Sequence, residues 1–156
     1  MSSPTRSARA GAMDFAARIT TAAPGTAGEA APTDPLLIRH HRTGAAEVAF
    51  AVPSGGHLLH LALATCVFND LHGAAAARGT RLGRVEVRAD GSFDDALARS
   101  TGIVLDVEAE AEGAAAGDLD RLVREVVDAA VIVRIVRASA DVRLASVVVR
   151  TTPPAA

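Results

Sequence analysis

The chain has 156 residues, enough for about one domain, and contains neither Tyr nor Trp and only four Phe. Its net charge is −2 and acids and bases are interspersed, so it lacks the basic stripe of nucleic-acid-binding proteins and the basic amphipathic helix of membrane-surface proteins. The single cysteine excludes an internal disulfide and a multi-cysteine metal cluster. No apolar run reaches the roughly 18 residues of a bilayer span, and no apolar secretory signal begins the chain. We expect a cytoplasmic protein with no nucleic acid and no membrane as partner.

Small and polar residues at both ends predict tails around a single domain. Residues 1–12 read as a disordered N-terminal tail, residues 13–150 as one domain, and residues 151–156 as a loose C-terminal tail. Within the domain, a first strand is expected near residues 15–21. Apolar residues 36–38 and 47–52 flank a polar turn, which predicts an antiparallel hairpin.

The central feature of the sequence is a Leu- and Ala-rich stretch. Its composition and the glycine that follows it predict one helix over about residues 56–78. Between Leu58 and Phe68 only His60 and Thr65 are polar, so this helix is apolar nearly all round. Such a helix is buried on several sides or lies in a subunit interface.

The C-terminal half alternates between strand and helix patterns. Residues 85–90 read as a strand ended by an Asp90-Gly91 turn, and residues 103–110 as a second strand whose acidic residues share a solvated face. A helix over residues 119–137, capped by Asp118, and a closing strand over residues 141–150 follow. The fold class is therefore α+β.

Cys66 is the first candidate for chemistry. It lies about ten residues into the predicted helix, where the helix dipole activates a thiol only weakly. At about 100° per residue, His57 lies roughly opposite Cys66 and His60 about 120° away, whereas Asp70 and Asn69 share its face. Without a cationic neighbour from elsewhere in the fold, Cys66 reads as a packing residue.

The histidines leave further alternatives open. His57 and His60 share a helix face, but two histidines with no third ligand nearby are a weak metal signal, and capping or interface roles fit them better. His40 and His41 lie between Arg39 and Arg42, which form a cationic cluster. This cluster is either a solvated turn or a source of an arginine that reaches a buried anion such as the Cys66 thiolate.

The layout resembles the OsmC/Ohr family of thiol-dependent hydroperoxide reductases. The resemblance rests on residues 55–66 (GGHLLHLALATC), on residues 79–87 (GTRLGRVEV), and on the predicted helix over residues 119–137 followed by residues 141–144 (DVRL). In the family, the first of these segments is a glycine-containing stretch that leads into the helix with the peroxidatic cysteine. The second resembles the strand that follows this helix, and the third resembles the family's second helix and last strand. It covers about 80 % of the chain, mainly residues 35–150.

The resemblance implies a fold and a mechanism. The fold is an OsmC-like intertwined homodimer, with antiparallel strands wrapped around long central helices. The mechanism begins with a Cys66 thiolate that attacks an organic hydroperoxide, releases an alcohol and becomes a sulfenic acid. A second cysteine would then form a disulfide with it, for reduction by a dithiol such as a lipoyl group.

The chain departs from this pattern at two positions. The region that corresponds to the resolving cysteine, residues 128–134 (DAAVIVR), has neither Cys nor Pro, and Gly56 and His57 stand where the family has an acidic residue. We therefore expect a divergent single-cysteine member resolved by an external thiol. Its site would consist of Cys66, an arginine on the thiolate (Arg39, or Arg42 as the second candidate) and His57 in place of the acid, with no cofactor and no metal.

Two functions remain open at this point. In the first, the chain is a one-cysteine hydroperoxide reductase with an external thiol reductant. In the second, the dimer binds or transforms a small apolar metabolite by other chemistry, with Cys66 as a packing residue and His57 and His60 as groups of the pocket. A purely structural dimer is a third possibility.

Overall fold

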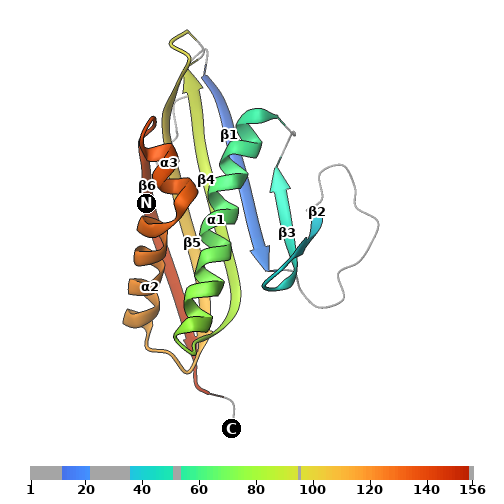
Figure 1. The fold of residues 1–156 in the computed structure, drawn as a ribbon, viewed down its shortest axis with the longest axis vertical. Helices are drawn as coiled ribbons and strands as arrows, with labels where there is room; N and C mark the ends of the chain where they lie inside the picture. The colour runs from blue at the N-terminus through green and yellow to red at the C-terminus, as the bar shows by residue number, and fades with distance from the viewer. Residues whose placement is uncertain (1–11, 22–35, 51–53, 95, 155–156) are drawn as a thin grey trace, which may run out of the picture.

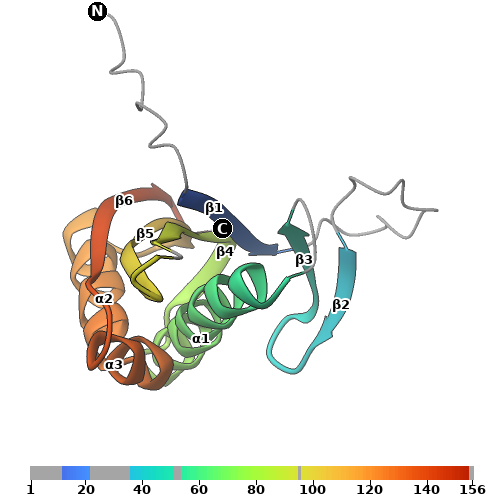
Figure 2. The same cartoon turned by 90° about the horizontal axis from the view of Figure 1, so that it is seen from above.

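A computed structural model describes residues 12–21, 36–50, 54–94 and 96–154 of the chain. They form one six-stranded sheet in the order β2-β3-β1-β4-β5-β6, with three helices on one face (Figures 1 and 2). This α+β architecture agrees with the predicted fold class. The elements in chain order are β1 (Ala12–Thr21), β2 (Leu36–His40), β3 (Gly44–Phe50), α1 (Gly55–Ala77), β4 (Arg81–Asp94), β5 (Arg99–Glu112), α2 (Ala116–Ala129), α3 (Val131–Arg137) and β6 (Val142–Thr152).

The N-terminal part is antiparallel β structure, as predicted. β2 and β3 form the hairpin, and β3 pairs with β1, which in turn pairs with β4. Gly44 has a φ of 76° where the hairpin turn enters β3, a conformation that favours glycine. The predicted tail covers residues 1–12; Ala12 already belongs to β1, and residues 1–11 lie outside the described residues. The predicted end of the second hairpin strand, residues 51–52, also lies outside them. Figure 2 shows the hairpin at the end of the sheet, away from α2 and α3.

Helix α1 is the central element and confirms the predicted helix within one residue at each end. Ser54 caps its N-terminus, and Gly79, with a φ of 67°, follows its C-terminus. Leu63, Val67 and Leu71 of α1 are fully buried against the sheet. Although α1 is 23 residues long, no helix in the described part of the chain combines the length and apolar character that a membrane span requires.

The predicted Asp90-Gly91 turn is wrong. β4 continues through Gly91 to Asp94 and pairs with β5 up to Asp94, with register shifts between Leu82 and Val85 and between Gly91 and Phe93, so the chain reverses beyond Asp94. Gly91 is needed for close packing instead: a Cβ atom there would lie 2.6 Å from the Gly102 carbonyl oxygen and 2.6 Å from His60 Nε2. The Asp-Gly dipeptide favours a turn when read in isolation. Here glycine is required because it has no side chain, which lets the Gly102 backbone and the His60 ring approach closely.

The predicted helix over residues 119–137 is two helices. The chain breaks at Ala130, whose ψ of 124° is not helical, and α3 begins at Val131. Nor does Asp118 cap the first helix. Ala115 is the N-cap residue, without a side-chain hydrogen bond, and Asp118 lies in the first turn, where it pairs with Arg121. A carboxylate in that turn still complements the helix dipole.

The last strand corrects the expectation of an entirely antiparallel sheet. β6 pairs with β5 in parallel, because α2 and α3 cross the face of the sheet and return the chain to the end from which β5 starts. β6 extends to Thr152, two residues beyond the predicted strand. The acidic face of β5 is confirmed as solvated: Glu108 and Glu110 pair with Arg150 of β6.

The close packing at Gly91 yields a stability prediction. We expect Gly91→Ala to lower the free energy of unfolding by about 1–3 kcal/mol, because the new methyl group meets a backbone carbonyl that cannot rotate away. Gly117→Ala in α2 is the matched control, since its Cβ would have open space around it. The free energy of unfolding of that variant should rise by about 0.4–1 kcal/mol. Urea unfolding measures both, and equal stability of the two variants would contradict the packing explanation.

Candidate functional site

A cavity beside α1 contains the only cysteine of the chain. Its volume is about 530 Å³ and its lining is mainly apolar. α1 supplies one wall, the end of β2 and the following turn supply two imidazoles, and α3 supplies one aliphatic side chain. The lining residues are His40, His41, Leu58, Leu61, Ala62, Thr65, Cys66, Asn69 and Ile132. A cavity of this size and character fits a small apolar molecule.

The thiol of Cys66 is half-buried and lies next to a carboxylate. Cys66 Sγ donates to Asp70 Oδ2 over 3.7 Å, one helical turn along α1. Burial raises the pKa of the Cys66 thiol above its ordinary value, and the negative charge of Asp70 raises it further. The backbone N–H groups of Ile132 and Val131, at the start of α3, act in the opposite direction. Burial and the carboxylate prevail, so the resting state of Cys66 in this chain is the thiol.

The imidazole of His40 forms the opposite flank of the cavity. His40 is 7 % exposed, and its ring lies edge-on to Phe68 with 5.0 Å between ring centroids. Phe68 also contacts His72, at 4.7 Å, so the three rings form one group between β2 and α1. Cys66 and Phe68 are two residues apart, which places them about 200° apart around the helix. His40 therefore packs on a different face of α1 from the one that carries Cys66, although both residues line the cavity.

The structure places the two predicted arginines at different points. Arg39 is exposed on β2 and is not among the residues that line the cavity. Arg42 donates from Nε to Asn69 Oδ1 over 2.9 Å, and Asn69 donates in turn to Asp70. Arg42 thus reaches the neighbourhood of the thiol through Asn69, whereas Arg39 is not brought to Cys66 within one chain. The role of Arg39 stays a prediction from the resemblance.

His57 and His60 lie on the part of α1 that faces away from the cavity. His57 is buried at the N-terminus of α1, where its Nδ1 atom is 2.8 Å from Ser54 Oγ and its backbone N–H donates to the same oxygen. His60 is fully buried, and its Nδ1 atom donates to the Gly56 carbonyl. The contacts of His57 belong to the capping role that the sequence favoured, whereas His60 packs inside the chain. The structure does not bring His57 together with Cys66, and its replacement of the acidic partner stays a prediction.

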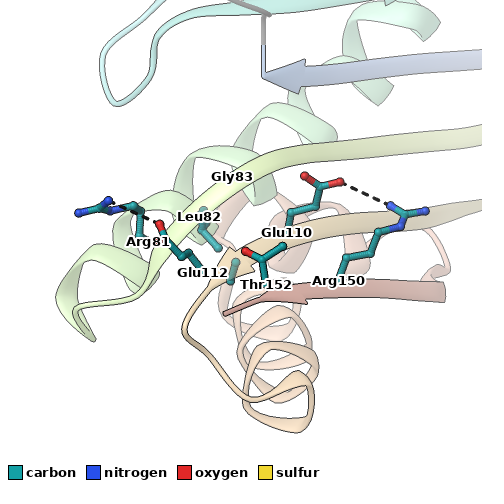
Figure 3. Close-up of a pocket in the computed structure, with 8 residues that line it drawn as sticks. Arg81, Leu82, Gly83, Glu110, Glu112, Arg150 and Thr152 are labelled. Atoms are coloured by element: carbon teal, nitrogen blue, oxygen red, sulfur yellow. Dashed lines mark hydrogen bonds and ion pairs between the residues drawn. The ribbon is translucent and has the colours of Figure 1, made fainter. Parts of the chain in front are cut away.

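A second hollow lies where β4 begins and where β5 and β6 end (Figure 3). Its volume is about 310 Å³, and its charged residues face each other in pairs, Arg81 with Glu112 and Arg150 with Glu110. It shares no lining residue with the cavity of Cys66. Because its charges neutralise each other, it offers a ligand little net electrostatic attraction.

The described residues contain no group of three or more metal-ligating side chains.

Two features of the site could not be predicted from the sequence: the N–H groups at the start of α3, and the pairing of His72 with His40. The N–H groups of Val131 and Ile132 reach Cys66 only because the second helix breaks at Ala130, which nothing in the sequence indicates. His72 had a visible signal, since it follows Phe68 by four residues on one helix face, but no pattern linked it to His40.

The family assignment rests on residues 51–145. This segment, well over half of the chain, matches the family model of OsmC-like protein. The chain belongs to the OsmC-like protein family. A search of curated proteins finds no match.

Two solved structures resemble this OsmC-like chain. One is the OsmC like protein from Mycoplasma pneumoniae, with 13 % identity over 79 % of this chain and 97 % of that one and a TM-score of 0.49. The other, from Legionella pneumophila, is described as an organic hydroperoxide resistance protein OsmC and predicted redox protein. It has 18 % identity over 76 % of this chain and 99 % of that one, with a TM-score of 0.48.

The carboxylate beside the thiol leads to a prediction about reactivity. Asp70→Asn removes a negative charge that disfavours the thiolate, so the pKa of Cys66 falls and alkylation by iodoacetamide at pH 7 becomes severalfold faster. The measurement is the alkylation rate against pH, followed by mass spectrometry. Asp118→Asn, an exposed site on α2, is the control and leaves the rate unchanged. A slower reaction in Asp70→Asn would contradict this account of the thiol.

Proposed function

We propose that this OsmC-like protein reduces apolar organic hydroperoxides with Cys66 as its single nucleophile. The observation that carries the proposal is the position of the thiol: it is half-buried in the wall of an apolar cavity large enough for a small organic molecule. The apolar lining favours an alkyl or aryl hydroperoxide over hydrogen peroxide, because burial of the organic group contributes to binding.

The reaction needs one external reductant. The sulfur of Cys66 attacks the terminal peroxide oxygen, the O–O bond breaks, and the thiol proton goes to the departing alkoxide, which leaves an alcohol and a Cys66 sulfenic acid. Asp70, which already accepts the hydrogen bond of the thiol, is the base that carries this proton. A first external thiol condenses with the sulfenic acid to give a mixed disulfide and water. A second external thiol restores Cys66 and leaves as a disulfide. The cytoplasm, the location expected from the sequence, contains such thiols.

The resolving step has to be external because the chain has one cysteine. At the break between α2 and α3, close to the thiol, stand the buried Ala130 and the N–H groups of Val131 and Ile132. These N–H groups stabilise negative charge on the sulfur as it reacts. The environment therefore supports the first step of the family's chemistry but holds no partner for an intramolecular disulfide.

We further propose that the active form is a homodimer. The cavity opens beside an exposed apolar surface that α1 and α3 share: Leu58 is 53 % exposed, Val131 62 % and Ile135 61 %. Large aliphatic side chains gathered around one opening mark an association surface. A second copy of the chain would cover them and enclose the cavity, and Arg39, which does not reach Cys66 of its own chain, would be placed across the interface.

A second candidate function is supported by the protonation state of the thiol. A Cys66 whose pKa is raised by burial and by Asp70 suits a packing role, in which the cavity holds an apolar metabolite without peroxide chemistry. The two candidates differ in what Cys66→Ala does: it abolishes the proposed reductase, but it leaves the affinity of a binding protein for its ligand unchanged.

Stopped-flow oxidation by cumene hydroperoxide tests the reductase. We expect the wild type to form one sulfenic acid per chain, detected as one added oxygen by mass spectrometry, and to react faster with cumene hydroperoxide than with hydrogen peroxide. Cys66→Ser is the control and gains no oxygen at this site. Oxidation no faster than that of free cysteine at the same pH would reject the proposal and favour the binding protein.

Sedimentation equilibrium tests the dimer. We expect the wild type to sediment as a dimer and Ile135→Arg to shift it toward the monomer, because a charge in the middle of an apolar interface is left unpaired. Val148→Arg is the matched control: Val148 is also exposed but lies on β6, away from the cavity, and this variant should remain dimeric. A monomeric wild type, or an equal effect of the two variants, would contradict the proposed interface.

A further inference from the structure

The β2–β3 hairpin, residues 36–50, is attached to α1 at its turn. Two side chains of the turn region contact α1: the ring of His40 packs on Phe68, and Arg42 bonds Asn69. β3 is held separately, by its pairing with β1 and by the burial of Ala46 and Val48 in the core. The guanidinium of Arg42 also lies against Gly73, where a Cβ atom would be only 3.0 Å from its Cζ atom. Apart from these contacts, β2 is the outer strand of the sheet, hydrogen-bonded on one side to β3.

The hydrogen bonds of His40 determine where its proton lies. Thr43 Oγ1 donates its single proton to the Ala45 carbonyl over 2.6 Å. The 3.1 Å contact between Thr43 Oγ1 and His40 Nδ1 must then have the histidine as donor. In the neutral ring, the proton is on Nδ1 and Nε2 carries a lone pair. That Nε2 atom is buried and has no hydrogen-bond partner among the described residues.

His72 of α1 is in a similar state. Its Nε2 atom is also buried without a hydrogen-bond partner in the described part of the chain, and its ring centroid is 6.5 Å from that of His40. The charges that act on these two rings are those of His41 and Arg42 from the hairpin and of each other. Asp70, the acid on this part of α1, makes its contacts with Cys66 and Asn69 instead.

We infer that His40 and His72 form a pH-sensitive latch that holds β2 and the turn of the hairpin on α1 while both rings are neutral. A proton added at the buried Nε2 of His40 creates an N–H group with no acceptor among the described residues and a positive charge beside Arg42, and a proton added to His72 places a positive charge in the same group of rings. Both costs disappear when the turn moves away from α1 and the rings meet water.

The direction of the pH dependence follows from the closed state, in which the turn of the hairpin lies on α1. Burial, the first cause for both rings, lowers the pKa of His40 and of His72 below the ordinary histidine value. The released hairpin binds more protons than the closed one, so acid favours release. The closed form is fully favoured above about pH 6.5, the ordinary pKa, and is lost progressively as the pH falls below it.

Release has a consequence for the cavity. His40 and His41 supply its hairpin wall, so movement of the hairpin opens the cavity on that side. On the proposed function, which this consequence assumes, mild acid would widen the access of a substrate to Cys66. The latch itself depends only on the two histidines and is tested without any activity.

Amide hydrogen exchange of the full-length protein, corrected for the intrinsic effect of pH, tests the latch. We expect protection in residues 36–44 to fall by about tenfold or more between pH 7.5 and pH 5.0, while β4 and β5 stay protected. The double variant H40F/H72F keeps the aromatic packing but cannot be protonated, and it should retain protection at pH 5.0. Asp118→Asn, which removes an exposed titratable group on α2, is the control and should behave as the wild type.

Three results would overturn the latch. Protection of residues 36–44 could be independent of pH, H40F/H72F could lose it in acid as the wild type does, or β4 and β5 could lose protection together with β2 and the turn, which would indicate global unfolding. If the double variant does not fold, the single variants His40→Phe and His72→Phe serve in its place, and each should shift the loss of protection to lower pH. If hydrogen exchange rejects the latch while peroxide reduction is observed, the proposed function stands. If peroxide reduction is absent while the pH-dependent exchange is observed, the latch stands.

Discussion

The structure depends on the burial of one helix that is apolar on nearly every side. α1 packs against β1 and β4 with Leu63, Val67, Phe68 and Leu71, all fully buried. α2 and α3 then pack beside it, with Val123, Val127 and Val133 in the same core. Because the core is built from aliphatic side chains, with Phe68 as its largest member, the arrangement relies on close packing, and glycine or alanine occupies the tightest points.

The apolar character of α1 also produces the site. A helix that is buried on most of its circumference still has one remaining side, and here that side carries Leu58, Cys66 and Asn69 beside the cavity. Cys66 is positioned by α1, while other groups around it come from distant segments of the chain: the turn of the β2–β3 hairpin and the first residues of α3.

The electrostatics of the site separate this chain from an activated thiol enzyme. A reactive cysteine usually has a cation nearby, whereas Cys66 has a carboxylate at hydrogen-bond distance and an arginine only behind Asn69. Two N–H groups from α3 offset part of this effect. The thiol is therefore protonated in the single chain, and in the proposed homodimer a second chain would change its surroundings.

The sequence by itself determined the elements with strong local signals. The period and composition of residues 55–77, the alternation of residues 103–110 and the hairpin around residues 39–44 all appear in the structure as predicted, because hydrophobic patterning dictates which side of an element is buried. Helical spacing alone placed Asp70 beside Cys66 and His57 away from it.

What only the tertiary structure decided was set by contacts between distant segments. Gly91 continues a strand because β5 and His60 approach it, and β6 runs parallel to β5 because two helices carry the chain back across the sheet. The break at Ala130 brings two N–H groups to Cys66, and the hairpin brings His40 to His72. None of these pairs is close in sequence, so no local pattern encodes them. They follow from how the sheet and helices pack, and they determine the protonation state of the thiol and of the histidines.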